Sequence, residues 1–251
     1  MSDQPDGEID QSADDTDRSD ELLIYHLFAD EGIESDYLTR FGRVVRVGLD
    51  PTDRNDSEPV AADVERLPLK PGADLAVAHP ECGPWNVMNA VHGNQDEQPR
   101  QVKMAREVCQ RVADHYIIEN VPDAPLKDPV VLKGSHFGLP ITKKRAFETS
   151  FHVPQPHLQQ PLTDHCANFD RYDRPRQWWE AVMGVENWYP IDPMVNAGMP
   201  RAYIEHLLQW YFVAVEEGQA EAEQELVAAT DGGNDCNVQP ETDRSGGPDN
   251  E

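Results

Sequence analysis

The chain has 251 residues with 47 acidic and 21 basic side chains, which gives a formal net charge of −26. That length is enough for one domain with a buried core, and no apolar run approaches the roughly 20 residues of a membrane-spanning helix. The four cysteines are too few and too scattered for a disulfide scaffold, and the acidic N-terminus lacks the basic and apolar stretches of a secretory signal. We therefore expect a monomeric cytoplasmic protein that does not act at a membrane.

Most of the negative charge lies near the two ends of the sequence. Residues 1–21 hold nine acids and one base, and residues 216–251 hold eleven acids and one base. Such segments bury too little apolar surface to fold, so we predict disordered tails on either side of one domain at residues 22–215. A charge of −26 argues against a nucleic-acid partner, but the central domain carries only −8 of it.

Short apolar runs and one amphipathic stripe organise the central domain. Buried strands are predicted where apolar residues cluster between turn residues, at residues 22–28, 43–49, 75–78 and 116–118. Helices are predicted at residues 30–41, 97–113, around 178–179, and 200–216. Residues 143–153 are predicted to be extended, and residues 154–175 to form a loop. Strands that alternate with helices predict a doubly wound, mostly parallel α/β sheet.

Polar side chains follow several of these strands, at the sheet edge where ligands bind in such folds. Asp50, Cys82 and Glu119 all occupy this kind of position. Cys82 lies in a turn between prolines that would present its thiol for nucleophilic attack, although a small core cysteine is the alternative. Glu119 is expected to be desolvated, to keep a raised pKa and to donate a proton, with a turn cap as the alternative. Cys109 lies on the apolar stripe of the helix at 97–113 and is interpreted as a core residue.

Three motifs between Leu75 and Phe151 follow one another in a recognisable order. They are Pro80-Glu81-Cys82, then Glu119-Asn120-Val121-Pro122, and then Lys143-Lys144-Arg145-Ala146-Phe147-Glu148. In this order they resemble the DNA cytosine-5 methyltransferase family, most closely its short phage and mobile-element forms, here with an acidic, haloarchaeal composition. The resemblance covers about residues 22–215, and Met199-Pro200-Arg201-Ala202-Tyr203 looks like the family's last motif, which closes the cofactor pocket.

The resemblance implies a Rossmann-like methyltransferase domain that methylates C5 of cytosine in DNA. Cys82 would attack C6 of the base, and Glu119 would hold N3 and the exocyclic amine while protonating the ring. Asn120 would brace the loop that carries Cys82, and Arg145 would bind near the cytosine O2. The target base would have to flip out of the duplex, because C6 cannot be reached within the stack.

The same resemblance implies S-adenosylmethionine as the methyl donor. The residues that would hold it are Phe28, Gly32, Asp50, Asp63 and Pro80. Asp50 would bind the ribose hydroxyls, and Asp63 would contact the adenine amine. His26 and Asp30 depart from the family's first cofactor motif, and a glycine at position 30 would let the backbone approach the donor.

Target recognition would fall to residues 151–183, a short region with a basic and aromatic cluster. The members of this cluster are Arg171, Arg174, Arg176, Trp178 and Trp179. A Trp pair that anchors a helix to the core is the alternative interpretation. No Cys-x-x-Cys or His-x-x-x-His pair occurs in the sequence, so no metal site is predicted.

Two other functions fit the same residues. A protein of this fold that has lost catalysis would bind DNA without methylating it, which the change at Asp30 favours. The retained Cys82, Glu119 and Arg145 oppose that alternative, because a binding protein needs no nucleophile. An enzyme with the same thiol chemistry could instead act on RNA or on free pyrimidine nucleotides, because the recognition region is short.

Only six of the 21 basic residues are lysine, and a chain so acidic and so poor in lysine is typical of a salt-rich cytoplasm. We therefore predict that the free energy of unfolding rises strongly between low and multimolar KCl, because salt screens the repulsion between surface carboxylates. Denaturant unfolding at the two salt concentrations measures this effect. An unchanged unfolding midpoint would contradict the prediction.

Overall fold

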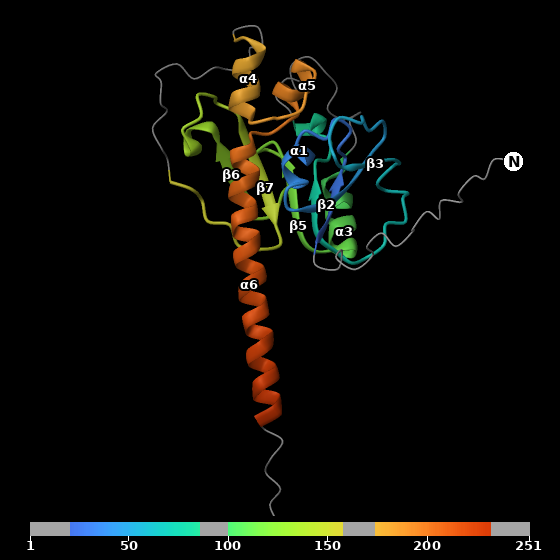
Figure 1. The fold of residues 1–251 in the computed structure, drawn as a ribbon, viewed down its shortest axis with the longest axis vertical. Coiled ribbons are helices and arrows are strands. Elements are labelled where there is room, and N and C mark those ends of the chain that lie inside the picture. The colour runs from blue at the N-terminus through green and yellow to red at the C-terminus, as the bar shows by residue number, and fades with distance from the viewer. Residues whose placement is uncertain (1–20, 86–99, 158–173, 232–251) are drawn as a thin grey trace, which may run out of the picture. The chain divides into compact units, whose positions relative to one another are not determined.

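The chain forms a mixed sheet of seven strands in the order β3-β2-β1-β4-β5-β7-β6 (Figure 1). The computed structural model describes residues 21–85, 100–157 and 174–231. The strands are β1 (Leu22–Leu27), β2 (Gly42–Gly48), β3 (Glu58–Ala61), β4 (Ala73–Ala78), β5 (Ala113–Asn120), β6 (Val130–Lys133) and β7 (Lys144–Thr149). Neighbours among β1 to β5 pair in parallel, whereas β7 runs antiparallel to β5 and β6. The expected doubly wound, mostly parallel α/β sheet is confirmed.

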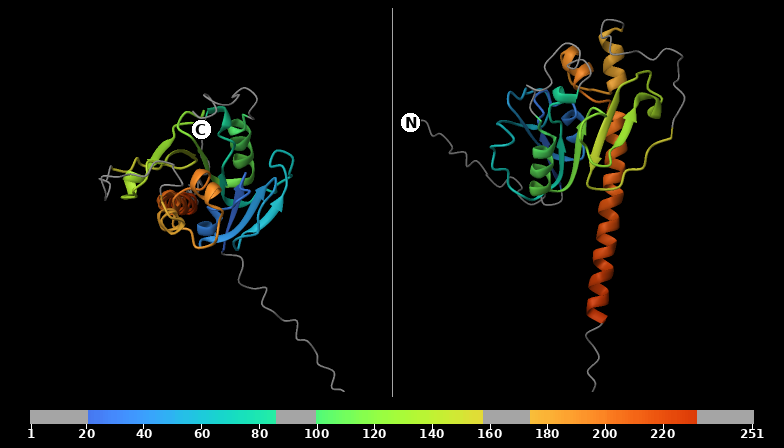
Figure 2. Two further views of the ribbon diagram at one scale, coloured as in Figure 1. Left: turned by 90° about the horizontal axis from the view of Figure 1, so that it is seen from above. Right: turned by 180° about the vertical axis from the view of Figure 1, so that it is seen from behind.

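Helices lie on both faces of this sheet (Figures 1 and 2). They are α1 (Ser35–Leu38), α3 (Val102–Val112), α4 (Arg176–Met183), α5 (Ile191–Asn196) and α6 (Arg201–Asp231). Helix α3 packs on one face against β4 and β5, whereas α1 and the beginning of α6 lie on the other face. The chain up to Tyr211 is one compact unit, and α6 continues into a second unit that begins at Phe212.

The strands predicted from apolar runs are confirmed as β1, β2, β4 and β5. The helix predicted at residues 30–41 is wrong in extent, because only its central turn, Ser35–Leu38, is helical. Strand β3 falls in a stretch that the prolines mark as a loop, and Pro59 is tolerated there because β3 is an edge strand. Helix α6 continues past residue 215, where the sequence predicts the start of the C-terminal tail. Residues 1–20 and 232–251 of the predicted tails lie outside the described residues.

One apolar layer fills the space between α3 and the sheet. Leu27, Ala78 and Ile118 contribute from three neighbouring strands, and Ala105 and Cys109 contribute from the stripe on α3. Burial of a large aliphatic side chain stabilises a fold by about 1.5–3 kcal/mol, so this layer holds α3 in place. Burial also raises the pKa of the Cys109 thiol to about 12. The interpretation of Cys109 as an inert core residue is therefore confirmed.

The opposite layer is rich in aromatic and titratable side chains. His115 of β5 contacts Tyr211 edge to face, with ring centroids 5.5 Å apart, and Phe147 of β7 contacts Tyr203 at 6.4 Å. Both tyrosines lie near the start of α6 and are buried. His26 of β1 is also fully buried in this layer.

Within the part of the chain that the structure describes, no helix has the length and apolar composition to cross a membrane.

Arg46 of β2 is a fully buried cation that fixes the loop after β1. Its Nη1 donates to the carbonyl oxygens of Ala29 at 2.9 Å and Asp30 at 2.6 Å, and its Nη2 donates to the carbonyl of Thr52. Gly32 has a φ of +64°, and a Cβ there would lie 2.6 Å from the Arg46 side chain. The turn therefore requires glycine at this position, for both its backbone conformation and its lack of a side chain.

We predict that Arg46→Met lowers the free energy of unfolding by about 3 kcal/mol, because one buried and two partly buried carbonyl oxygens lose their donor. Urea unfolding measures the loss. Arg43→Met on the same strand is the matched control, because Arg43 forms only a half-exposed ion pair with Glu58, and such pairs contribute less than about 1 kcal/mol. Equal losses in the two variants would show that Arg46 does not anchor the loop.

Candidate active site

A cavity of about 250 Å³ opens where the carboxyl ends of β1, β4 and β5 meet. Its wall consists of residues 28–34 after β1, residues 79–82 after β4, Glu119, Arg145, and residues 196–198 after α5. A second cavity of about 460 Å³ lies beside Tyr116 and Glu148 and contains none of the predicted site residues. The smaller cavity lies at the edge where ligands bind in open α/β sheets. It is therefore the candidate site.

Cys82 reaches this cavity from a tight turn after β4. Its carbonyl oxygen accepts a hydrogen bond from the Trp85 N–H at 3.0 Å, where the 3-10 helix η1 (Gly83–Trp85) begins. Cys82 is partly exposed, whereas Cys109 is buried. Of these two described cysteines, Cys82 is thus the thiol that a substrate can reach, as nucleophilic catalysis requires.

Glu119 ends β5 as a buried carboxylate between the side chains of Arg145 and His79. Arg145 Nε lies 2.8 Å from its Oε1, and His79 Nδ1 lies 3.3 Å from its Oε2. Burial raises the pKa of the Glu119 carboxyl, but the His79 hydrogen bond and the Arg145 charge outweigh burial and lower the pKa below its usual value. The expected raised pKa is therefore wrong, because the sequence did not reveal the second partner, His79. At neutral pH Glu119 is an ionised hydrogen-bond acceptor.

Asn120, the next residue, connects β5 to the loop that carries the cysteine. Its Nδ2 donates to the Pro80 carbonyl oxygen at 2.8 Å, and its Oδ1 accepts the Val121 N–H at 2.9 Å. The side chain is almost fully buried. Because Pro80 lies two residues before Cys82, this amide fixes the start of the turn from which the thiol reaches the cavity.

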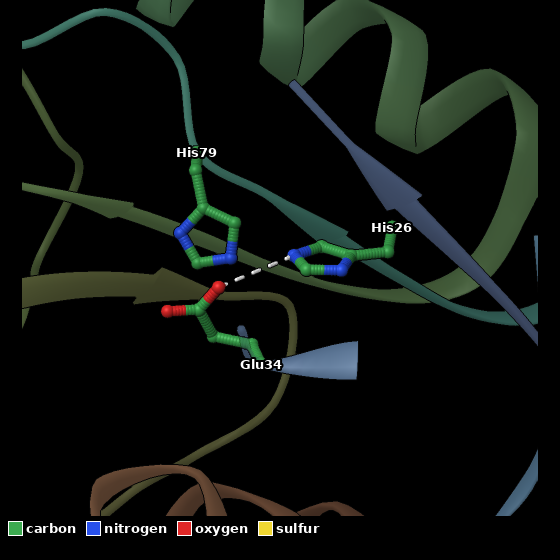
Figure 3. Close-up of side chains that lie close together, drawn as sticks. All are labelled: His26, Glu34 and His79. Carbon is green, nitrogen blue, oxygen red and sulfur yellow. Dashed lines mark ion pairs between the residues drawn. The ribbon is translucent and has the colours of Figure 1, made fainter. Parts of the chain in front are cut away.

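Sequence reasoning missed a group of three residues beside Glu119. His26, Glu34 and His79 come from β1, the start of α1 and the loop after β4, and Figure 3 shows their polar atoms pointing toward one another. Burial, with the neighbouring His79 and Arg46, holds the pKa of His26 well below its usual value. Although burial lowers the pKa of His79, the Glu34 and Glu119 carboxylates raise it above its usual value. No short sequence spacing signals this group, because its members lie on separate elements.

Lys143, directly before β7, lies behind the candidate site among buried side chains. It is almost fully buried, and its Nζ donates to the carbonyl oxygens of Val195 at 2.8 Å and Asn196 at 3.1 Å. Burial and the nearby Arg145 charge lower its pKa well below its usual value, against the opposing effect of Glu119. Arg145 Nη2 donates to the same Asn196 carbonyl at 3.0 Å. The two side chains thus hold the end of α5 beside the site.

The residues that the resemblance assigns to the cofactor divide into two groups. Phe28, Gly32 and Pro80 line the cavity. Asp50 and Asp63 follow β2 and β3 at the same edge of the sheet but are not part of the cavity wall. Asp63 accepts the Glu65 N–H at 3.0 Å as a turn cap.

Asp30, which departs from the family motif, joins the ends of β1 and β2. Its Oδ1 accepts the Asp50 N–H at 2.9 Å, and a Cβ at Gly48 would lie 2.1 Å from the same oxygen. The carboxylate therefore binds the backbone of the neighbouring loop, in a space that only a glycine at position 48 leaves open.

The predicted basic and aromatic cluster lies partly outside the described residues, which exclude Arg171. Trp179 is buried in a second apolar cluster, and Trp178 packs against that cluster. These contacts favour the interpretation of the Trp pair as an anchor for α4. Arg176 donates to the Tyr189 carbonyl at 2.7 Å, so it also helps to fix this region.

No protein-family model and no curated protein matches the chain. Among solved structures, a protein provisionally described as an RNA methyltransferase of Pyrococcus horikoshii is similar over 57% of this chain and 75% of its own, with a TM-score of 0.35 and 10% identity. WbdD, crystallised with a kinase inhibitor, is similar over 57% and 39% of the two chains (TM-score 0.32, 16% identity). A methyltransferase related to antibiotics is similar over 53% of this chain and 89% of its own, with a TM-score of 0.30 and 14% identity. These values describe a partial likeness in fold.

We predict that Asn120→Ala lowers the free energy of unfolding by about 1–2 kcal/mol, because the buried Pro80 carbonyl loses its donor. Asn120→Asp should cost more, because it retains an acceptor for Val121 but places a carboxylate oxygen against that carbonyl. Thermal unfolding of the two variants measures the order. If Asn120→Asp were as stable as the wild type, the hydrogen bond from Asn120 to the Pro80 carbonyl would not stabilise the loop.

Proposed function

We propose that this protein transfers a methyl group from S-adenosylmethionine to C5 of cytosine in DNA, through a covalent bond between Cys82 and C6 of the base. The observation that carries the proposal is the composition of one cavity. Cys82, Glu119 and Arg145 line it together with Phe28 and Gly32, so a nucleophile, a base-binding pair and residues of the first cofactor motif share a single wall.

The side chains in this wall match the chemistry that cytosine requires. The Cys82 thiolate adds to C6, and the electron pair of the C5–C6 double bond moves toward C5. The Arg145 guanidinium stabilises negative charge that develops on the ring oxygen. Glu119, as a carboxylate, accepts a hydrogen bond from the exocyclic amine of the base. The electron pair at C5 then forms the bond to the donor's methyl group, and loss of the C5 proton to water lets the C6–sulfur bond break and regenerates the thiolate.

The lining of the cavity also suits the methyl donor. Asp30 and Glu31 are among the residues that line the cavity, and their negative charges complement the ammonium and sulfonium charges of S-adenosylmethionine. Leu49 is 74% exposed directly before Asp50, so an apolar surface for an adenine ring adjoins an acid for the ribose hydroxyls. The donor supplies an electrophilic methyl group to the activated C5 carbon.

A surface tryptophan supports nucleic acid as the substrate. Trp188 is 59% exposed, and the guanidinium carbons of Arg54 and Arg176 lie 5.3 and 5.0 Å from its ring centroid. Aromatic faces beside arginines bind unstacked bases by stacking, with little dependence on sequence. Such a surface suits a base that has left the duplex stack.

We predict that the protein, incubated in multimolar KCl with labelled S-adenosylmethionine and cytosine-containing duplexes, transfers label to C5, and that Cys82→Ser abolishes the transfer. Cys109→Ser is the matched control and should retain activity, because its buried thiol with a pKa of about 12 takes no part. Scintillation counting with nucleoside analysis measures the label. Transfer by a folded Cys82→Ser variant would disprove the covalent mechanism.

Duplexes with 5-fluorocytosine provide a second readout. Fluorine at C5 cannot leave as a proton does, so the wild type should remain attached to the DNA and Cys82→Ser should not. Label on RNA or free cytidine nucleotides alone would assign the same chemistry to a different substrate. DNA binding without any label or adduct would favour a catalytically inactive binding protein.

A further inference from the structure

The sheet register brings two histidines and a glutamate to one point. His26 of β1 is aligned with Val77 of β4, and His79, two residues further on, shares its face because side chains along a strand alternate. The His79 N–H still donates to the Leu27 carbonyl at 3.1 Å, which continues the pairing beyond the strand. Glu34 reaches the same point from the start of α1.

The facing ring nitrogens of the two histidines lack hydrogen-bond partners within the described part of the chain. His26 Nε2 and His79 Nε2 are buried, and neither has a hydrogen-bond partner among the residues that the structure describes. His26 Nε2 lies 3.9 Å from Glu34 Oε2, and one ligand atom from each residue lies within 4.8 Å of the other two (Figure 3). A buried polar atom without a partner costs free energy. A cation bound between these atoms would remove that cost.

The opposite atom of each side chain is held by a second residue. His26 Nδ1 lies 2.6 Å from Ser35 Oγ, His79 Nδ1 lies 3.3 Å from Glu119 Oε2, and Glu34 Oε1 accepts the Met199 N–H at 2.8 Å. Metal-binding histidines commonly donate their other ring N–H to a carboxylate or hydroxyl group, which fixes the tautomer and the ring orientation. All three side chains therefore have the supporting contacts of metal ligands.

We propose that His26, Glu34 and His79 bind a divalent first-row transition-metal ion such as Zn²⁺. Two imidazole nitrogens and one carboxylate oxygen suit Zn²⁺, Co²⁺ or Fe²⁺ and do not suit Mg²⁺ or Ca²⁺, which prefer oxygen ligands. Binding of the ion to these three residues needs neither DNA nor a methyl donor, so the metal site can be tested separately from the proposed methyl transfer.

The distances require only a small contraction around the ion. Ligand atoms around a tetrahedral zinc lie about 2.0–2.1 Å from the ion and therefore about 3.4 Å from one another. Two of the present ligand atoms that lie 4.8 Å apart would have to approach each other by roughly 1.4 Å. Side-chain rotation suffices for such a change. Three protein ligands leave a fourth position for water or a cavity ligand, and Glu34 and His79 also line the candidate site.

Isothermal titration of the metal-stripped full-length protein with Zn²⁺ tests the proposal. The wild type should bind one ion per chain, and His26→Asn should weaken the affinity by more than about 100-fold, beyond the 10- to 100-fold effect of an outer-shell change. Ser35→Ala, which removes only the group that orients His26, should weaken it by about tenfold. His152→Asn is the matched control and should change nothing, because His152 is an exposed histidine outside the group.

Two further measurements guard against variants that fail to fold. Glu34→Gln preserves the side-chain volume and an acceptor for the Met199 N–H, and circular dichroism verifies its fold before titration. X-ray absorption of the zinc-loaded wild type should show nitrogen and oxygen ligands without sulfur. Absence of Zn²⁺ binding, unchanged affinity in both His26→Asn and Glu34→Gln, or sulfur among the ligands would each overturn the proposal. Loss of methylation in Cys82→Ser with unchanged Zn²⁺ binding would support a metal site that is independent of the Cys82 thiol.

Discussion

The site depends on the Glu119 carboxylate, a buried group that contacts both the Arg145 guanidinium and the His79 ring. A carboxylate removed from water without such partners costs several kcal/mol. Strand β7 supplies Arg145, and the loop after β4 supplies His79. The buried carboxylate at the end of β5 is therefore stable only when both of these elements are in place. The antiparallel pairing of β7 beside β5 aligns Glu119 with Phe147, two residues from Arg145. The sheet topology thus makes the charge at this edge tolerable.

The main chain at the end of α5 and directly after it binds three more polar side chains near the site. The last carbonyl groups of a helix have no intrahelical donor and attract cations, and Lys143 and Arg145 donate to those of Val195 and Asn196. In the same segment, the Met199 N–H donates to the Glu34 carboxylate. This segment thereby provides hydrogen-bond partners for Lys143, Arg145 and Glu34, of which Arg145 and Glu34 line the cavity. This explains how a segment far along the sequence from Cys82 can form part of its cavity.

The sequence predicted the elements whose cause is local and missed those whose cause is tertiary. Apolar runs bounded by turns identified β1, β2, β4 and β5, and the apolar stripe identified α3 and the burial of Cys109. An edge strand that contains Pro59 has no such pattern, because its stability comes from pairing with β2. Motif order grouped Cys82, Glu119 and Arg145, which line one cavity. The pKa of Glu119 was predicted in the wrong direction because its sign depends on His79, which only the alignment of β4 beside β5 brings within reach.

His79 connects the two proposals made for this edge of the sheet. An ion on Nε2 leaves the ring proton on Nδ1, which is the nitrogen that faces Glu119 Oε2 at 3.3 Å. The bound ion would therefore fix His79 as a donor to Glu119 and hold that carboxylate in the orientation in which Arg145 contacts its other oxygen. A target base would then contact a Glu119 carboxylate that is held in one orientation. In the proposed enzyme the ion acts as a support for base binding, while the bond to the base is formed by Cys82.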